Sequence, residues 1–245
     1  MLQFGFVKRL SRVLPKWSNH LLPYVNDYMT VASIGLPTIQ RIDQAALSVV
    51  FFPACINRVF DDPKVISDGK KTTVEAALRI FSKAGIQTIY PQKVGQLCCG
   101  LPFSSKGLAD AAEQAAIQTT EMLWLASDQG KTPIVMDTSP CSFHMKHYDQ
   151  VLGGQYLDHW QDLKIFDISE YLHDIVIPRL TISPVLGEAV LHPTCSTIKM
   201  GLKEKMLSVA KTCADRAVFP EDTGCCGFAG DRGMFYPELT DSATL

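Results

Sequence analysis

The sequence predicts an α/β fold with two pseudo-symmetric halves, each built on a short, mostly parallel sheet flanked by helices. Short apolar runs alternate with amphipathic helical segments, which is typical of parallel α/β sheets, and the same order of elements occurs twice along the chain. With 245 residues, 47% of them hydrophobic, the chain is long enough to bury a sizeable core. We expect a lead-in segment at residues 1–47, a first unit at 48–160 and a second, truncated unit at 161–245.

The first unit has the pattern strand, helix, strand, helix, strand. Its opening run, SVVFFPAC, predicts a buried strand that ends in a proline-containing loop and a cysteine. Gly85 stops the first helix, since glycine is common just after helix ends. The predicted elements are a strand at 48–55, a helix at about 71–84, a strand at 86–91, a helix at about 107–128 and a strand at 132–137.

The second unit begins near residue 164 and echoes that order. A strand at 188–195 ends on Pro-Thr-Cys, as the first unit's strand ends on Pro-Ala-Cys. A helix at about 198–214 and a short strand at 217–220 follow, and in both units a strand that ends in proline leads to Cys-Cys-Gly. An internal duplication is the simplest explanation of this repeated order.

The charge balance argues against a nucleic-acid partner. Lys and Arg number 23 against 25 Asp and Glu, which gives a net charge of -2 without a long run of one sign. The N-terminus does not have the pattern of a signal peptide, and no apolar run approaches the roughly 20 residues of a transmembrane helix. We therefore expect a cytoplasmic protein without a transmembrane segment, in which the eight cysteines are metal ligands or redox groups rather than structural disulfides.

The lead-in segment is basic and repeatedly broken by prolines. This composition favours a linker from another domain or subunit, and the alternative is an amphipathic stretch lying on the inner face of the membrane. In either case we expect the segment to pack against something else.

Seven of the eight cysteines fall into two similar sets. In each set, a cysteine after a proline turn precedes a Cys-Cys-Gly, and the first set has a further cysteine after its third strand. Because each lies just beyond a predicted strand, the cysteines are expected at one edge of a parallel sheet, where open α/β sheets hold ligands. The predicted metal ligands are Cys55, Cys98, Cys99 and Cys141 in the first set and Cys195, Cys225 and Cys226 in the second.

The residue types point to a soft metal or a cluster. Thiolates are the ligands of iron-sulfur clusters, and sulfur donors select such clusters, zinc or Cu(I) over hard cations. Gly100 and Gly227 are expected to shape the cofactor-binding turns, because glycine accepts positive φ and lets the backbone approach closely. Zinc and disulfide exchange are the alternatives, although the paired C-x-x-C knuckles of structural zinc sites are absent. Cys213 is expected to be a small buried hydrophobe on a helix face.

Two histidines and one charged turn leave further alternatives open. His144 and His192 each stand three residues from a predicted ligand, and each suits a cluster ligand, a proton donor or a loop histidine bonded to backbone. Asp231 and Arg232 suit a salt bridge, a contact to a partner or substrate, or a solvated turn.

These motifs resemble the cysteine-rich Cys-Cys-Gly (CCG) domain family, in which C…CCG…CxxC occurs twice. The resemblance covers the chain from about Ser48 onward. Relatives in that family include the catalytic subunit of heterodisulfide reductase, the iron-sulfur subunits of glycolate oxidase and anaerobic glycerol-3-phosphate dehydrogenase, and the C-terminal part of FAD-linked iron-sulfur D-lactate dehydrogenase. HPTCSTIKMGL (192–202) and CCGFAGDRG (225–233) resemble the last of these most.

The chain departs from the family motif in both halves. His144 stands where the first motif has its last cysteine, so one thiolate is missing there. The second motif lacks its final cysteine before the chain stops at Leu245, so we expect an incomplete second site and an exposed apolar patch at residues 234–239. Neither an FAD domain nor a C-x-x-C-x-x-C ferredoxin motif is present, which favours a fragment or a separately encoded piece of a larger enzyme.

The resemblance implies the electron-transfer module of a flavin-dependent oxidoreductase. FAD in an associated domain or subunit would oxidise a 2-hydroxy acid such as D-lactate. Electrons would pass through a ferredoxin-like iron-sulfur domain and 4Fe-4S clusters of this chain to an acceptor such as a quinone or cytochrome. The alternatives are a catalytic thiol or disulfide module resembling heterodisulfide reductase, and a structural module that holds zinc or nothing. The sequence singles out no catalytic residue.

Overall fold

The computed structural model describes residues 31–32, 35–43, 45–61, 71–221, 224–228 and 232–243. The chain divides into two compact units, each of which is described by itself. The larger comprises Ala32–Glu221, and the smaller comprises Met1–Val31 with Asp222–Leu245. The expectations for residues 1–30 and for Asp231 lie outside the described residues, and the division of the chain at residues 160 and 161 stays a prediction.

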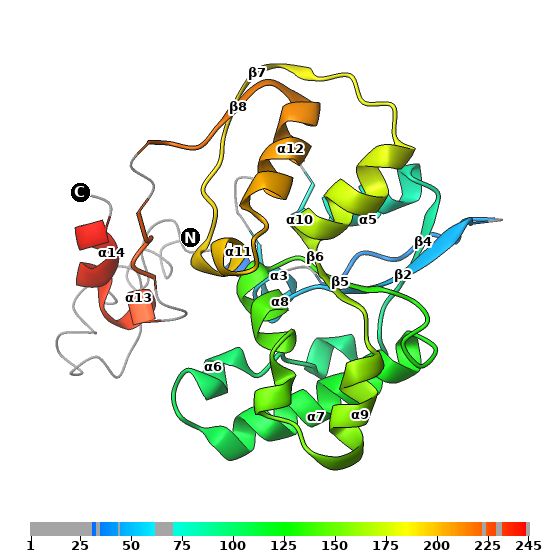
Figure 1. Cartoon of the computed structure of the whole chain (residues 1–245), viewed down its shortest axis with the longest axis vertical. Helices are drawn as coiled ribbons and strands as arrows, with labels where there is room; N and C mark the ends of the chain where they lie inside the picture. Colours follow the sequence, from blue (N-terminus) through cyan, green and yellow to red (C-terminus); the bar gives the residue numbers. More distant parts are fainter. Residues whose placement is uncertain are drawn as a thin grey trace, which may run out of the picture. The chain divides into compact units, whose positions relative to one another are not determined.

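The larger unit is built on a four-stranded parallel sheet with the strand order β4-β2-β5-β6 (Figure 1). The central strand β2 is buried from Val49 to Phe52, as its unbroken apolar run predicts for a strand covered on both faces. Val50 pairs with Ile89 on one side and with Ile134 on the other. The strands are β2 (Leu47–Phe52), β4 (Ile86–Ile89), β5 (Ile134–Met136) and β6 (Ile165–Asp167).

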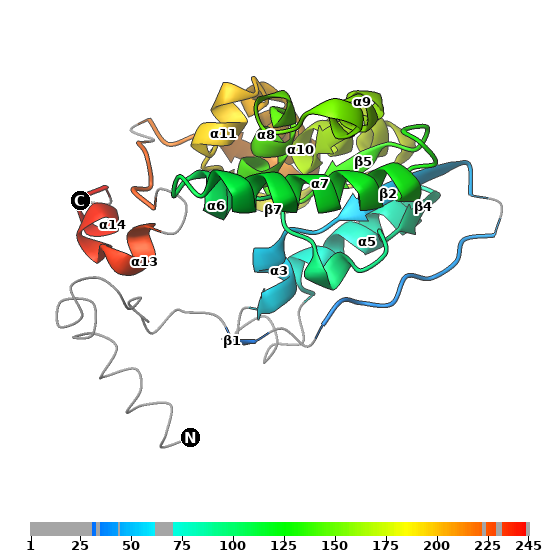
Figure 2. The ribbon, with the colours of Figure 1, turned by 90° about the horizontal axis from the view of Figure 1, so that it is seen from below.

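Helices cover both faces of this sheet, so the unit has three layers (Figures 1 and 2). Val50 and Phe52 point to one face and Val49 and Phe51 to the other, which gives two separate apolar cores. The first face is covered by α7 (Ala109–Ala126), α8 (Ser139–Met145) and α9 (Gly154–Asp162). The second face is covered by α5 (Thr73–Lys83), α10 (Ile168–Tyr171) and the π-helix η3 (Leu172–Val176). The predicted α/β fold with short parallel sheets is therefore confirmed.

Helix α5 shows why the sequence folds as predicted. Thr72 caps its start by accepting a hydrogen bond from the Glu75 amide, while the Glu75 carboxylate accepts one from the Thr72 amide. Such a capping box satisfies two backbone donors at a helix start. The helix ends just before Gly85, whose φ of 71° lies in the left-handed region that glycine adopts readily.

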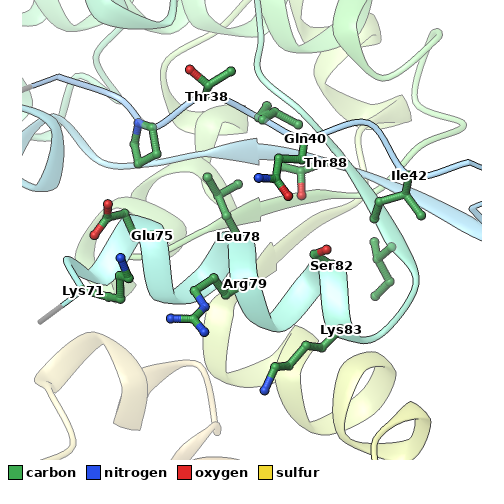
Figure 3. Close-up of a pocket in the computed structure, with 13 residues that line it drawn as sticks. Thr38, Gln40, Ile42, Lys71, Glu75, Leu78, Arg79, Ser82, Lys83 and Thr88 are labelled. Atoms are coloured by element: carbon green, nitrogen blue, oxygen red, sulfur yellow. The ribbon is translucent and has the colours of Figure 1, made fainter.

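The described end of the lead-in segment packs along α5 and β4. The Tyr90 hydroxyl donates to the Pro37 carbonyl at 3.4 Å, and the Ile42 amide donates to the Gln87 side chain at 2.8 Å. Between this segment and α5 lies a cavity of about 460 Å³ (Figure 3). Its lining residues include no cysteine.

The second half of the larger unit repeats the element order of the first. Strands β7 (Val185–Val190) and β8 (Ala214–Val218) pair in parallel, as β2 and β4 do. Cys195 begins the five-residue helix α11 (Cys195–Lys199), as Cys55 begins the five-residue helix α3 (Cys55–Val59). Most residues of β7 are exposed, including Leu186, which has 93% of its surface exposed.

The structure corrects three expectations in this half. The strand expected at 188–195 starts and ends earlier, at Val185 and Val190. The helix expected at 198–214 is two helices, α11 and α12 (Lys203–Cys213), because Gly201 adopts a φ of 69° between them. Cys213 is exposed rather than buried, since it ends a helix that has no buried residue.

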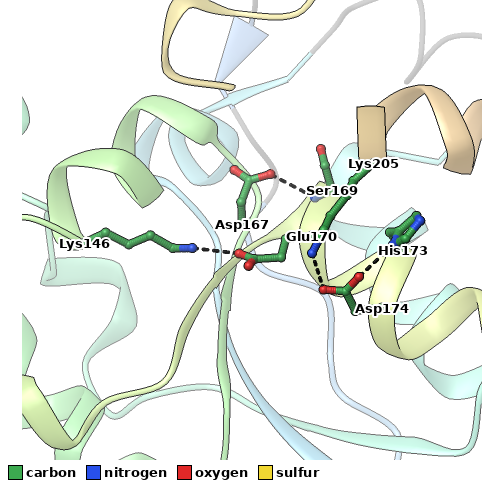
Figure 4. Close-up of polar contacts among 7 residues, drawn as sticks. All are labelled: Lys146, Asp167, Ser169, Glu170, His173, Asp174 and Lys205. Atoms are coloured by element: carbon green, nitrogen blue, oxygen red, sulfur yellow. Dashed lines mark hydrogen bonds and ion pairs between the residues drawn. The ribbon is translucent and has the colours of Figure 1, made fainter. Parts of the chain in front are cut away.

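Polar contacts join this second half to the first. The Thr197 hydroxyl of α11 donates to the Ser139 hydroxyl of α8 at 3.1 Å. Lys205 of α12 forms an ion pair with Asp174 of the π-helix (Figure 4). The Asp174 carboxylate also lies 2.6 Å from the His173 ring nitrogen Nδ1. Lys146, just after α8, and Glu170 of α10 form an ion pair of 2.7 Å.

The described part of the smaller unit consists of a loop and two short helices, α13 (Arg232–Phe235) and α14 (Pro237–Ala243). Gly227 has a φ of 68°, and a Cβ atom placed there would lie 2.2 Å from the Leu239 carbonyl oxygen. Only glycine therefore fits at this turn. Tyr236 and Leu239 have 43% and 44% of their surface exposed.

The remaining described elements are short. None of the described helices is long and apolar enough to span a membrane. The remaining short elements are β1 (Val31–Ala32), β3 (Phe60–Asp61), η1 (Val94–Gln96), α6 (Leu101–Ser104), η2 (Tyr148–Gln150) and η4 (Ile177–Arg179).

Candidate metal centre

The cysteines of the first set follow three neighbouring parallel strands. Cys55 stands three residues beyond β2, and Cys141 stands five residues beyond β5, within α8. Cys98 and Cys99 follow β4 after a short loop and η1. Since parallel strands end at the same edge of a sheet, all four residues are delivered to one place. The sheet edge expected from the sequence is confirmed for this first set.

The four side chains contact one another in sequence. The Cys55 thiol donates a hydrogen bond to the Cys98 sulfur. The Cys99 thiol forms hydrogen bonds with the sulfurs of Cys98 and Cys141. Cys99 and Cys141 are buried, whereas Cys55 and Cys98 are half-buried. The predicted convergence of the first set is therefore confirmed, with two of its thiols toward the solvent side.

Hydrogen bonds concentrate negative charge on Cys98. The thiol of Cys55, then that of Cys99, lowers the pKa of Cys98 to about 2, and the Gly100 amide at 3.4 Å and the charge of Arg58 act in the same direction. The pKa values of Cys55 and Cys99 are raised, because both thiols donate hydrogen bonds and are partly or largely buried. Cys98 is thus the thiolate of the group.

Buried hydroxyls hold the backbone of the Cys-Cys pair. The Thr119 hydroxyl of α7 donates to the Cys98 carbonyl at 2.8 Å, and the Tyr148 hydroxyl of η2 donates to the Cys99 carbonyl at the same distance. Both side chains are fully buried, so these bonds are shielded from water. They fix the turn that presents the two sulfurs.

Gly100 makes that turn possible. Its φ is 81°, and a Cβ atom there would lie 3.1 Å from the Ala112 carbonyl oxygen. The positive φ expected for both Gly100 and Gly227 is confirmed. Their role in holding a cofactor stays a prediction.

Two charged residues belong to this site although the sequence reasoning missed them. Asp137 directly follows β5 and accepts a hydrogen bond from the Ala54 amide at 2.7 Å, and burial raises its pKa. The rule that located the cysteines beyond strand ends also covers Asp137. Arg58 stands one helical turn after Cys55 and is buried, and the sequence pattern carried no signal for it.

His144 lies close to the thiol group. Burial lowers its pKa, and its ring is near enough to Cys98 to feel the charge of that sulfur. Among the described residues, no hydrogen-bond partner contacts its buried Nε2 atom. An unpartnered buried nitrogen near the Cys98 sulfur fits a site that takes a further ligand.

The donor chemistry fits an iron-sulfur cluster. Cysteine sulfurs are the usual ligands of such clusters, and four of them meet here with backbone amides of Gly100 and Leu101 donating to the sulfurs of Cys98 and Cys99. In the described part of the chain, no three His, Cys, Asp or Glu side chains are arranged to hold a single metal ion. The fit therefore rests on the donor set and not on a preformed coordination shell.

The second set is divided between the two units. Cys195 is exposed at the start of α11 in the larger unit, whereas Cys225 and Cys226 are exposed in the loop of the smaller unit. His192 is also exposed. The convergence of this second set, and the ligand role of all seven cysteines, stay predictions.

Residues 49–146 match the model of the cysteine-rich domain family CCG. This region therefore resembles the CCG domain. The match spans all four cysteines of the first set and His144. The matched region contains the thiol group and most of strands β2, β4 and β5, at whose edge the group lies.

Several curated proteins are similar to this chain. Lactate utilization protein A of Bacillus cereus (strain G9842) is 24% identical over 192 residues, which cover 75% of this chain and 73% of that protein. A subunit of the anaerobic glycerol-3-phosphate dehydrogenase of Escherichia coli (strain K12) is 25% identical over 151 residues, 61% of this chain. A subunit of the fumarate reductase (CoM/CoB) of Methanothermobacter marburgensis is 26% identical over 170 residues, 68% of this chain.

The chain spans only part of two of these relatives. It covers 37% of the dehydrogenase subunit and 32% of the fumarate reductase subunit. No solved structure matches this chain.

Proposed function

We propose that the chain is an iron-sulfur redox module of an oxidoreductase. The observation that carries this proposal is the meeting of four cysteine thiols at the edge of the parallel sheet. The relatives support it, because two of them are named as subunits of a dehydrogenase and a reductase. Cys55, Cys98, Cys99 and Cys141 hold the cluster, which supplies one-electron transfer when bound.

The surrounding residues prepare the site for this role. Cys99 and Cys141 are buried, so their side of the site excludes water. Cys55 and Cys98 are half-buried, so their side is within reach of a redox partner. Thr119 holds the Cys98 carbonyl, which keeps the ligand loop rigid.

At a finer level, we propose that the electrons come from a 2-hydroxy acid such as D-lactate. Lactate utilization protein A supports this substrate class, because it is similar over most of its own length. FAD in a partner domain or subunit oxidises the acid, and electrons leave to an acceptor such as a quinone or cytochrome. A ferredoxin-like iron-sulfur domain links the flavin to this chain.

The test is reduction of the reconstituted chain, followed by electron paramagnetic resonance. D-lactate together with a flavin-dependent D-lactate dehydrogenase serves as the electron donor, and dithionite serves as the positive control. We expect both donors to reduce the wild-type chain, and the Cys98→Ser variant to lose the signal. If dithionite reduces the chain but D-lactate with the dehydrogenase does not, the substrate proposal is contradicted, while the proposal of a redox module is still supported.

A second candidate is a disulfide reductase resembling the catalytic subunit of heterodisulfide reductase. The thiolate of Cys98 and the thiol of Cys55, both half-buried, favour it, as does the name of the fumarate reductase (CoM/CoB) relative. Two electrons and two protons would cleave one substrate disulfide into two thiols. Turnover of a mixed disulfide of two small thiols by the dithionite-reduced chain would support this candidate, and the absence of thiol release would exclude it.

A further inference from the structure

A buried guanidinium group lies at the base of the thiol group. Arg58 is the fourth residue of α3, one turn beyond Cys55, and only 8% of its surface is exposed. Fully buried arginines are rare unless their charge is compensated. The groups around Arg58 therefore indicate which negative charge compensates its positive charge.

Arg58 ties together two of the segments that carry cysteines. Its terminal nitrogens donate to the carbonyl oxygens of Val94 and Leu97, and Leu97 directly precedes Cys98. The guanidinium carbon also lies over the face of the Phe52 ring, 5.7 Å from the ring centre. Helix α3, which begins at Cys55, is thereby fastened to the loop of the Cys-Cys pair.

The hydrogen bonds do not neutralise the charge of Arg58. Carbonyl oxygens carry no net charge, and among the described residues the buried Nε atom has no partner and no carboxylate forms an ion pair with this guanidinium. The acidic groups that interact with it electrostatically are the sulfurs of Cys55, Cys98 and Cys141 and the carboxyl group of the buried Asp137. A buried charge without a counter-charge is costly.

We propose that Arg58 is the positioning residue and counter-ion of the thiol group: it fastens Cys55 to the Cys98 loop and balances the negative charge of the sulfurs and of the metal group they hold. This inference rests on the proposed function for the identity of that group. It follows that removing the charge of Arg58 weakens binding of a soft metal to the thiols. It also shifts the reduction potential of a bound cluster to more negative values, because net charge sets that potential.

The first test uses Cd²⁺ as the probe on the metal-free full chain under reducing conditions. The thiolate absorption of bound Cd²⁺ is titrated, and the Cys98→Ser variant supplies the background from the other cysteines. We expect Arg58→Gln to weaken binding at the first set about tenfold or more, as for one full charge lost near an anionic site. The matched control is Arg79→Gln on the exposed side of α5, which should bind as the wild type does. Equal affinity of Arg58→Gln and Arg79→Gln would overturn the proposal.

Arg58→Lys separates the charge from the two hydrogen bonds, and circular dichroism checks that each variant folds. Lysine keeps the charge and loses the planar fork. Binding within about threefold of the wild type supports the counter-ion role, and a loss of about tenfold or more overturns it, even if Arg58→Gln does not fold.

The second test measures the midpoint potential after reconstitution with iron and sulfide. We expect a more negative value for Arg58→Gln than for the wild type and no change for Arg79→Gln; an unchanged value in Arg58→Gln would contradict the proposal. If the wild-type chain takes up no iron and sulfide, the proposed function fails, while the Cd²⁺ titration still decides the role of Arg58.

Discussion

Replacement of Gly100 by alanine tests whether the Cys-Cys turn needs glycine for its backbone angle, for its lack of a side chain, or for both. Gly107 has a similar φ, 74° against 81°, but a Cβ atom there would meet nothing within 4 Å, whereas at Gly100 it would lie 3.1 Å from the Ala112 carbonyl oxygen. Gly95 has neither a positive φ nor a close neighbour. The three glycines therefore separate the two effects.

The expected sizes follow from these geometries. A left-handed non-glycine residue costs about 1–2 kcal/mol, partly offset by the reduced entropy of the unfolded chain, so Gly107→Ala should destabilise by about 1 kcal/mol. Gly100→Ala adds a crowded contact in a packed region and should cost about 2–4 kcal/mol. Gly95→Ala should be neutral or slightly stabilising.

The assay is urea-induced unfolding of each variant, followed by tryptophan fluorescence, since Trp160 packs against the core that contains Cys99. Equal losses in Gly100→Ala and Gly107→Ala would show that the contact with Ala112 does not matter. A neutral Gly100→Ala would show that the turn does not need glycine.

Three other substitutions test separate parts of the structure. Tyr148→Phe should cost about 1–3 kcal/mol in urea unfolding, because it leaves the buried Cys99 carbonyl without its donor; an unchanged midpoint would show that this bond is not needed. Phe81→Ala should cost about 3–5 kcal/mol, because it opens a cavity in a fully buried position between two core rings; a loss below about 1 kcal/mol would mean that the core refills. Hydrogen bonds from Lys205 and His173 lower the pKa of Asp174, so its stabilising effect is present above the unfolded value of about 3.9 and is lost as the pH falls through the folded value. Asp174→Asn should therefore cost less than about 1 kcal/mol at pH 7 and progressively less as the pH falls below the unfolded value, and a difference that grows in acid would contradict this sign.

The sequence predicted the location of the first cysteine set because the rule involved is topological. The parallel strands β2, β4 and β5 all end at one edge of the sheet. Residues just beyond these strands therefore lie close together, independently of how the side chains pack. The burial of β2 was predicted from its continuous apolar run, which is typical of a strand covered on both faces.

The supporting residues of the site could not be predicted in this way. Arg58 contacts carbonyl groups 36 and 39 residues away, and the Tyr148 hydroxyl reaches one 49 residues away. Backbone carbonyls occur at every position and leave no mark in the sequence, so such pairs depend on the folded geometry. Cys213 was placed wrongly because helical periodicity does not show whether a neighbouring element covers that face.

Metal analysis of the anaerobically purified chain tests whether the first cysteine set holds an iron-sulfur cluster. Iron, acid-labile sulfide and zinc are measured for the wild type, for a Cys98→Ser/Cys141→Ser double variant, and for Cys213→Ser as an exposed-cysteine control outside both sets. We expect a brown wild-type protein with iron and sulfide, the same content in Cys213→Ser, and loss of most of both elements in the double variant. Zinc without sulfide in the wild type, or equal iron and sulfide in the double variant, would contradict it.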